Sequence, residues 1–199
     1  MAKINWKREI FTIPNLLSLF RLALIPVYIW MFLNAETPRD YYLSAGIITL
    51  SCLTDMFDGM IARKFNMISN IGKILDPLAD KLTQFTLALC LAIHRNNIFL
   101  WFVIALLVVK EFYQLIALAI SIRRGRVLKG ARLSGKICTT ILFVSLAAMV
   151  MFYTIPPIAV DIIAIVDILF LLYAFIDYII VYSRKDSNFE SVDDAANLT

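Results

Sequence analysis

Runs of about 20 apolar residues dominate the chain, and that length is what a helix needs to cross the hydrocarbon core of a bilayer. Six such runs and their short connections account for nearly all 199 residues. Apolar residues make up 61% of the chain and charged residues 17%, against about 45–50% and about 25% in soluble domains. The pattern excludes a soluble domain of any size, a secreted disulfide scaffold and a disordered chain.

We therefore predict an all-α, polytopic membrane protein in which residues 1–199 form one domain with six transmembrane helices. A helix satisfies its own backbone in lipid, whereas the runs lack the alternation that barrel strands need. Cys52, Cys90 and Cys138 lie within apolar runs at unrelated spacings, so neither a disulfide framework nor a zinc site is indicated. The predicted spans are residues 13–33, 41–62, 74–93, 98–122, 133–153 and 158–182.

Basic residues outside the spans predict the orientation. The N-terminal tail, the second-to-third loop, the fourth-to-fifth connection and the C-terminal tail hold three, three, six and two of them, 14 in all. The opposite side has only Arg39 and Arg95. By the positive-inside rule, both termini lie in the cytoplasm. A cell-membrane protein is expected, with the bilayer as a partner and no nucleic acid. His94, at the far end of the third span, is expected to be an ordinary loop residue.

Four aspartates occupy the cytoplasmic ends of the second and third predicted spans. Asp55 and Asp58 are three residues apart and Asp76 and Asp80 are four apart, so each pair shares one face of its helix. A charge inside a span costs about 2.5–3.5 kcal/mol on insertion scales and therefore marks function by default. Since a short loop joins these antiparallel helices, all four carboxylates can surround one point. One such aspartate alone is commonly a helix cap, but four together indicate a site.

Carboxylates gathered in a low-dielectric site repel one another unless cations neutralise them. All-oxygen ligands suit Mg²⁺ or Mn²⁺, and two metals bridged by carboxylates are a known arrangement for phosphoryl chemistry. Gly59, Ala62 and Gly72 leave room for a bulky polar ligand to approach the helices. Arg63 stands where it could pair with a phosphate. We therefore expect a site with two divalent metals that acts on a phosphorylated substrate.

Residues 55–80 read DMFDGMIARKFNMISNIGKILDPLAD. This segment, the aspartate motif, matches D-x2-D-G-x2-A-R-x8-G-x3-D-x3-D without a gap or substitution, and it resembles the CDP-alcohol phosphotransferase family. Residues 14–26, PNLLSLFRLALIP, resemble the first helix of that family. The resemblance implies a six-helix core and a homodimer.

The resemblance also implies roles for individual residues. Asp55 and Asp76 would bridge two metal ions, Asp58 would complete the shell of the first, and Asp80 would complete the second and act as general base. An acceptor hydroxyl would attack the β-phosphorus of the donor, and CMP would leave. The residues that would bind CDP-diacylglycerol are Asn15, Ser18, Arg21, Gly59, Ala62, Arg63, Ser69 and Gly72.

Basic residues of the fourth and fifth spans and of the segment between them bear on the identity of the acceptor. Most of the basic cluster between the fourth and fifth spans reflects orientation and anionic headgroups, but Lys110 lies deeper, inside a span. An anionic acceptor such as glycerol 3-phosphate needs fixed cations, and Lys110, Arg132 and Lys136 are the candidates. The motif region and Gly135–Thr139 are most similar to the phosphatidylglycerophosphate synthase branch. That branch typically has Arg at position 110 and Lys at position 138, where this chain has Lys110 and Cys138.

Other functions stay open at this point. A cardiolipin synthase of the same family, with phosphatidylglycerol as acceptor, is the main alternative. A cation transporter is a weaker one, because its carboxylates would lie near the midplane. A third is an inactive family member, and the intact motif argues against it. Asp161, Asp167 and Asp177 in the sixth span have no assigned role. Asp177 is expected to pair with Arg184 or with a basic residue of another helix.

Overall fold

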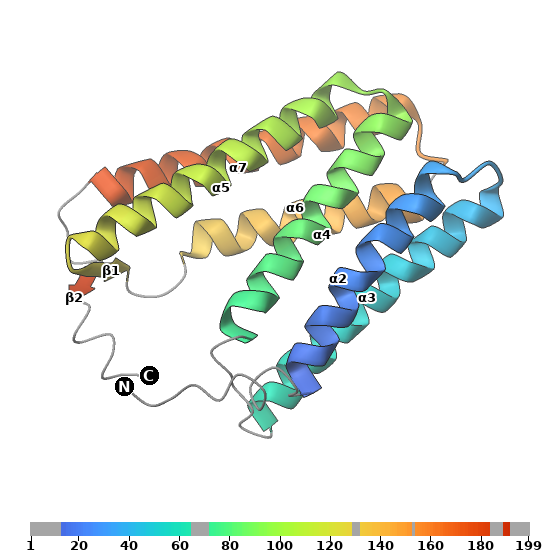
Figure 1. Cartoon of the computed structure of the whole chain (residues 1–199). Coiled ribbons are helices and arrows are strands. Elements are labelled where there is room, and N and C mark those ends of the chain that lie inside the picture. The colour runs from blue at the N-terminus through green and yellow to red at the C-terminus, as the bar shows by residue number, and fades with distance from the viewer. Residues whose placement is uncertain (1–12, 65–71, 129–131, 153, 184–188, 192–199) are drawn as a thin grey trace. The chain divides into compact units, whose positions relative to one another are not determined.

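The computed structural model describes residues 13–64, 72–128, 132–152, 154–183 and 189–191 (Figure 1). Within these ranges, the side chains of residues 13–14, 55–64, 73–74, 126–128 and 189–191 are outside the description. Six helices carry the described part of the fold, which confirms the all-α prediction, and two three-residue strands were not predicted. The elements are α2 (Ile13–Leu33), α3 (Pro38–Lys64), α4 (Gly72–Arg95), α5 (Ile98–Arg123), β1 (Arg126–Leu128), α6 (Leu133–Met151), α7 (Pro157–Ser183) and β2 (Phe189–Ser191).

Four of these helices are long and apolar enough to cross a membrane: α2 from Asn15 onward, α5, α6 and α7. They make the chain a multi-pass membrane protein. The other two helices, α3 and α4, contain the aspartate motif, whose charged residues make these helices less apolar than the other four. The count of six spans and the cytoplasmic termini stay predictions.

Two compact units make up the chain, and unit 1 comprises residues 1–96 and 146–155. Within it α2 packs against both α3 and α4, and Figure 1 shows α2 and α3 side by side. The largest buried side chains include Tyr28 and Phe32 of α2 and Leu87 and Leu91 of α4. This packing places one face of α2 against the helix that carries the second half of the motif.

His94 corrects one sequence expectation. It lies in the last turn of α4 and not in a loop, because the helix continues to Arg95. Its ring centroid is 5.5 Å from that of Phe32 and 5.1 Å from that of Tyr41. These aromatic contacts fasten the end of α4 to α2 and α3.

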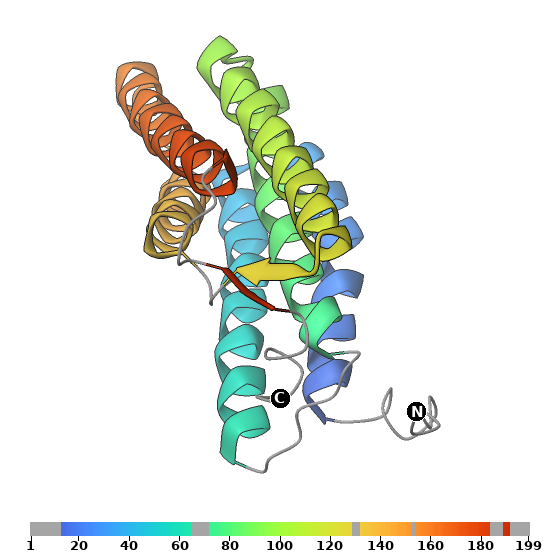
Figure 2. The same cartoon turned by 90° about the vertical axis from the view of Figure 1, so that its left-hand side faces the viewer.

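Unit 2 comprises residues 97–145 and 156–199, so α6 contributes to both units. Here α5 packs against α7, and the ring of Tyr113 meets that of Phe175 edge to face, with centroids 5.4 Å apart. After α5, Gly125 adopts a φ of 70°, the left-handed conformation that commonly ends a helix. β1 and β2 then form an antiparallel pair, which Figure 2 shows next to the end of α5.

Hydrogen bonds between Thr37 and Asp40 define the start of α3. The Asp40 carboxylate accepts hydrogen bonds from the backbone N–H of Thr37, at 2.9 Å, and from its hydroxyl, at 2.7 Å. Pro38 occupies the first helical position, where its missing N–H costs nothing. The hydrogen bonds from Thr37 lower the pKa of Asp40. The sequence T-P-R-D therefore defines where this helix begins.

Asn97 is the N-cap residue of α5. Its side-chain oxygen accepts from the backbone N–H of Phe99, at 2.9 Å, and of Leu100, at 3.4 Å, while its amide donates to Asp161 at 2.5 Å. Asn97→Ala should lower the free energy of unfolding by about 1 kcal/mol, as loss of a helix cap does. Asn97→Ser, which keeps a capping oxygen but also loses the amide, is the control. Thermal unfolding in detergent measures both, and equal melting temperatures would contradict a capping role.

Candidate active site

The second half of the aspartate motif lies on one face of α4. Asp76 and Asp80 are four residues apart, so their side chains project from successive turns of the same face. Both are half exposed, with 41% and 50% of the side-chain surface accessible. Two carboxylates at this spacing can share a cation or divide between two.

A polar face of α2 meets these carboxylates. The Ser18 hydroxyl donates a short hydrogen bond to Asp76. The Arg21 guanidinium donates to Asp80, with Nη1 2.7 Å from Oδ1, and its Nη2 lies 4.0 Å from Oδ1 of Asp76. Asn15 lies one turn before Ser18 and is also buried. Four residues that the sequence assigned to one site, Ser18, Arg21, Asp76 and Asp80, are therefore in contact in unit 1.

Burial makes the pairing of Arg21 necessary. Only 2% of this residue is exposed, and a charge taken out of water without a partner is strongly destabilising. Asp80 supplies a charge-assisted hydrogen bond, the stronger kind in proteins. The half-exposed carboxylates remain open to ligands, while the arginine that orients them is enclosed.

The remaining predicted donor-site and metal residues are described less fully. Gly72 is the first residue of α4 and is buried. Asp55, Asp58, Gly59, Ala62 and Arg63 belong to α3 by their backbone, but their side chains lie outside the description, and Ser69 lies outside the described residues altogether. Among the described side chains, no three from His, Cys, Asp and Glu gather at one point. The predicted four-carboxylate cluster is therefore described at two of its four members.

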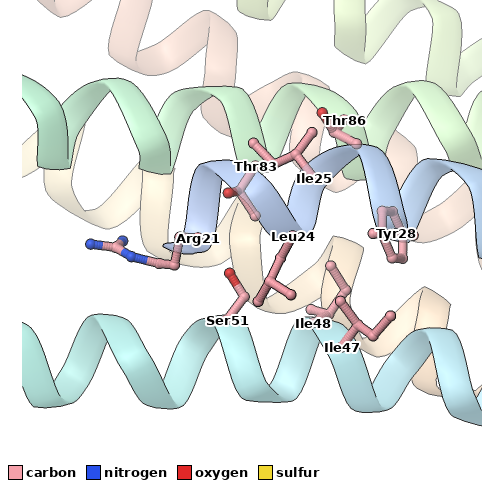
Figure 3. A pocket seen from close by; sticks show the side chains of 9 residues that line it. All are labelled: Arg21, Leu24, Ile25, Tyr28, Ile47, Ile48, Ser51, Thr83 and Thr86. Carbon is pink, nitrogen blue, oxygen red and sulfur yellow. The ribbon is translucent and has the colours of Figure 1, made fainter. Parts of the chain in front are cut away.

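A small cavity continues from Arg21 between α2, α3 and α4 (Figure 3). Besides Arg21 and apolar residues, it is lined by Tyr28, Ser51, Thr83 and Thr86. The buried Tyr28 hydroxyl has no hydrogen-bond partner among the described residues. Sequence reasoning missed these residues, although the three-residue spacing of Thr83 and Thr86 was a readable sign of a polar helix face.

The three candidate acceptor residues belong to unit 2. Lys110 is buried, and its Nζ lies 2.6 Å from Oε1 of Glu111 and 3.3 Å from Oε1 of Gln114. Arg132, immediately before α6, binds Asp177 with two parallel hydrogen bonds, and these raise its pKa. Lys136 is exposed. Lys110 lies midway along α5, whereas Arg132 and Lys136 lie just before and within the first turn of α6.

The aspartates of α7 all have hydrogen bonds. Asp161 accepts from Asn97, and Asp167 accepts from Ser145 at 2.6 Å. Asp167 is buried, and its second oxygen has no partner among the described residues. Asp177 pairs with Arg132 from outside its own helix, which is one of the two pairings the sequence left open.

The geometry and the motif together define a class of protein. The chain matches the family described as CDP-alcohol phosphatidyltransferase over residues 11–178, and it belongs to that family. The predicted family and transferase class are thereby confirmed.

The names of individual relatives refer to two kinds of enzyme. The chain is 35% identical over 119 residues to "Cardiolipin synthase (CMP-forming)" of Streptomyces coelicolor, covering 59% of this chain and 54% of that protein. It is 47% identical over 70 residues to "CDP-diacylglycerol--glycerol-3-phosphate 3-phosphatidyltransferase" of Rickettsia bellii, covering 35% and 38%. A "Putative cardiolipin synthase" of Mycobacterium tuberculosis is 34% identical over 107 residues, covering 54% and 49%. The chain thus spans about half or less of these relatives.

Removing the Arg21 charge tests the contact between α2 and α4. Arg21→Met should lower the free energy of unfolding by about 1.5–3 kcal/mol, the worth of a hydrogen bond to a charged group. Arg21→Lys, which keeps the charge, should lose less. Exposed Arg39 provides the control, and Arg39→Met should change stability by no more than about 0.5 kcal/mol. Thermal unfolding in detergent separates the three, and equal stability of Arg21→Met and Arg39→Met would contradict the pairing.

Proposed function

We propose that this protein transfers the phosphatidyl group of CDP-diacylglycerol to glycerol 3-phosphate, releasing CMP and forming phosphatidylglycerophosphate. The observation that carries the proposal is the contact of Asp76 and Asp80, two residues of the intact aspartate motif, with Ser18 and Arg21 of α2. The family match supports it. The Rickettsia bellii relative, named for this reaction, supports the choice of acceptor.

The donor set of this site suits a divalent cation. Asp76 and Asp80 offer hard carboxylate oxygens on one half-exposed helix face, which is the chemistry that Mg²⁺ and Mn²⁺ prefer. Members of the family generally depend on a divalent metal. We propose two ions, held by Asp55, Asp58, Asp76 and Asp80. When bound, they would neutralise the diphosphate of the donor and the charge that develops on CMP.

Proton transfer, orientation of the carboxylates and binding of the donor are carried out by side chains of the protein. Asp80 accepts the proton of the acceptor hydroxyl as that oxygen attacks the β-phosphorus. Arg21 orients Asp80 through Oδ1, and Ser18 orients Asp76. In this proposal Asn15, Ser18 and Arg21 would bind the donor together with Gly59, Ala62, Arg63, Ser69 and Gly72. Catalysis rests on positioning and charge neutralisation, without a covalent enzyme intermediate.

The acceptor's phosphate would meet Lys110, Arg132 and Lys136. Lys110 is buried and paired with Glu111, Arg132 is partly exposed and paired with Asp177, and Lys136 is exposed. A second candidate acceptor is phosphatidylglycerol, which the longer alignment to the Streptomyces coelicolor protein named cardiolipin synthase supports. Both acceptors share a phosphate group and a free hydroxyl.

The cellular setting is part of the proposal. We place the protein in the cell membrane, with the active site facing the cytoplasm, and expect a homodimer. Since the family match covers residues of both compact units, the two would act as one catalytic domain. Family membership also argues against a transporter.

An acceptor screen tests the proposed reaction. Purified protein with CDP-diacylglycerol should release CMP fastest with glycerol 3-phosphate, and more slowly with phosphatidylglycerol, serine or inositol phosphate. The lipid product is identified by mass spectrometry. Release with phosphatidylglycerol alone would replace the proposed reaction by cardiolipin synthesis, and no release with any acceptor would contradict a transferase.

Metal removal tests the carboxylate site. Chelator should abolish CMP release, and Mg²⁺ or Mn²⁺ should restore it, because two or more like charges otherwise face one another. Ca²⁺ should restore little, since its larger radius and looser shell disturb in-line geometry. Full turnover after exhaustive chelation would overturn the metal site.

Asp80→Asn should separate chemistry from binding. The amide keeps the shape of the carboxylate but cannot take a proton, so turnover should fall by about 10²-fold or more. CDP-diacylglycerol should still bind, because Asp55, Asp58 and Asp76 remain. Steady-state kinetics and a donor-binding titration measure the two properties. Near-normal turnover would assign the general base to another group.

A further inference from the structure

Among the three α7 aspartates, Asp177 is hydrogen-bonded to two described residues, whereas Asp161 and Asp167 are each hydrogen-bonded to one. The Arg132 fork approaches Asp177 with Nε 3.1 Å from Oδ2 and Nη2 2.6 Å from Oδ1. The Ser134 hydroxyl donates to Oδ2 as well. One carboxylate on α7 therefore holds the residue just before α6 and a residue in its first turn.

The start of α6 is also fixed by packing. A Cβ atom on Gly135 would overlap the Tyr178 hydroxyl and lie 3.2 Å from two carbons of its ring, so a larger residue here would require Tyr178 to move. Tyr178 directly follows Asp177 on α7. These two neighbouring residues of α7 thus fix the start of α6 and the Arg132 guanidinium just before it.

Arg132 keeps the capacity to bind an anion while it is paired. A guanidinium has five N–H donors in a planar fork, and the bonds to Asp177 use two of its nitrogens. Its side chain is 31% exposed, whereas that of Asp177 is 19% exposed. Lys136 follows one helical turn later, its backbone N–H bonded to the Arg132 carbonyl at 3.1 Å, and it is exposed. The pair therefore presents an oriented guanidinium with a second cation beside it.

We propose that Asp177 is a positioning residue for the acceptor: it holds the Arg132 guanidinium in the orientation that binds the acceptor's phosphate. This rests on the proposed function, in which that phosphate is the feature the cations recognise. A flexible arginine must lose side-chain freedom on binding, and a carboxylate that fixes it in advance removes that cost from the binding step.

Kinetics on the whole protein test the role. Asp177→Asn removes the charge and places an amide N–H₂ against the guanidinium, so the KM for glycerol 3-phosphate should rise about tenfold, as for loss of one charge-assisted contact. The kcat and the KM for CDP-diacylglycerol should change less than about threefold. Asp177→Glu should recover most of the acceptor KM, and Ser134→Ala should have a smaller effect in the same direction. Asp161→Asn, the same change elsewhere on α7, should leave all constants unchanged.

A double variant tests whether Asp177 acts through Arg132. If Asp177 acts through Arg132, adding Asp177→Asn to Arg132→Gln should raise the acceptor KM no further. Additive effects, parallel rises in both KM values, or a loss of melting temperature alone would each overturn the positioning role. If the wild-type protein uses phosphatidylglycerol and not glycerol 3-phosphate, the proposed reaction fails. The same variants, assayed with phosphatidylglycerol, then decide the role of Asp177.

Discussion

The contact between the Arg21 guanidinium and the carboxylates of α4 is the interaction on which the described site depends. It links α2 to α4 by pairing the almost completely buried charge of Arg21 with the half-exposed carboxylate of Asp80. Because an enclosed arginine is costly without a partner, α2 must pack with this face toward α4. Ser18, one turn earlier, then meets Asp76. The helix that looks like an ordinary apolar span thus carries the residues that orient the site.

Unit 2 uses the same principle with the roles exchanged. There the basic residue, Arg132, is partly exposed, and the carboxylate that orients it lies on an apolar helix. In both units a charged residue on a largely apolar helix orients a more exposed group of opposite sign. One pair thus presents a carboxylate at a fixed position and the other presents a cation, and neither leaves a charge alone in the apolar interior.

Much of the fold could be predicted because the length of a membrane-spanning helix appears in the sequence as a run of about 20 apolar residues. The 13–33 prediction coincides with α2, and the other five lie within a few residues of α3 to α7. The β1–β2 pair could not be predicted, since three residues carry no period. The aspartate motif identified Asp76 and Asp80, but their partners Ser18 and Arg21 depend on how α2 is rotated, which only packing decides. The Arg132–Asp177 pairing is a choice among several nearby cations that the sequence leaves open.

Binding of Mn²⁺ to the purified protein, followed by electron paramagnetic resonance, tests the central claim that the α4 carboxylates belong to a divalent-metal site. A carboxylate that ligates a metal directly contributes at least as much as a supporting residue, whose loss costs about 10–100-fold in affinity. Asp76→Asn should therefore weaken Mn²⁺ binding by about tenfold or more, while Asp161→Asn, on α7, leaves it unchanged. Equal Mn²⁺ affinity in the wild-type and Asp76→Asn proteins would contradict the account.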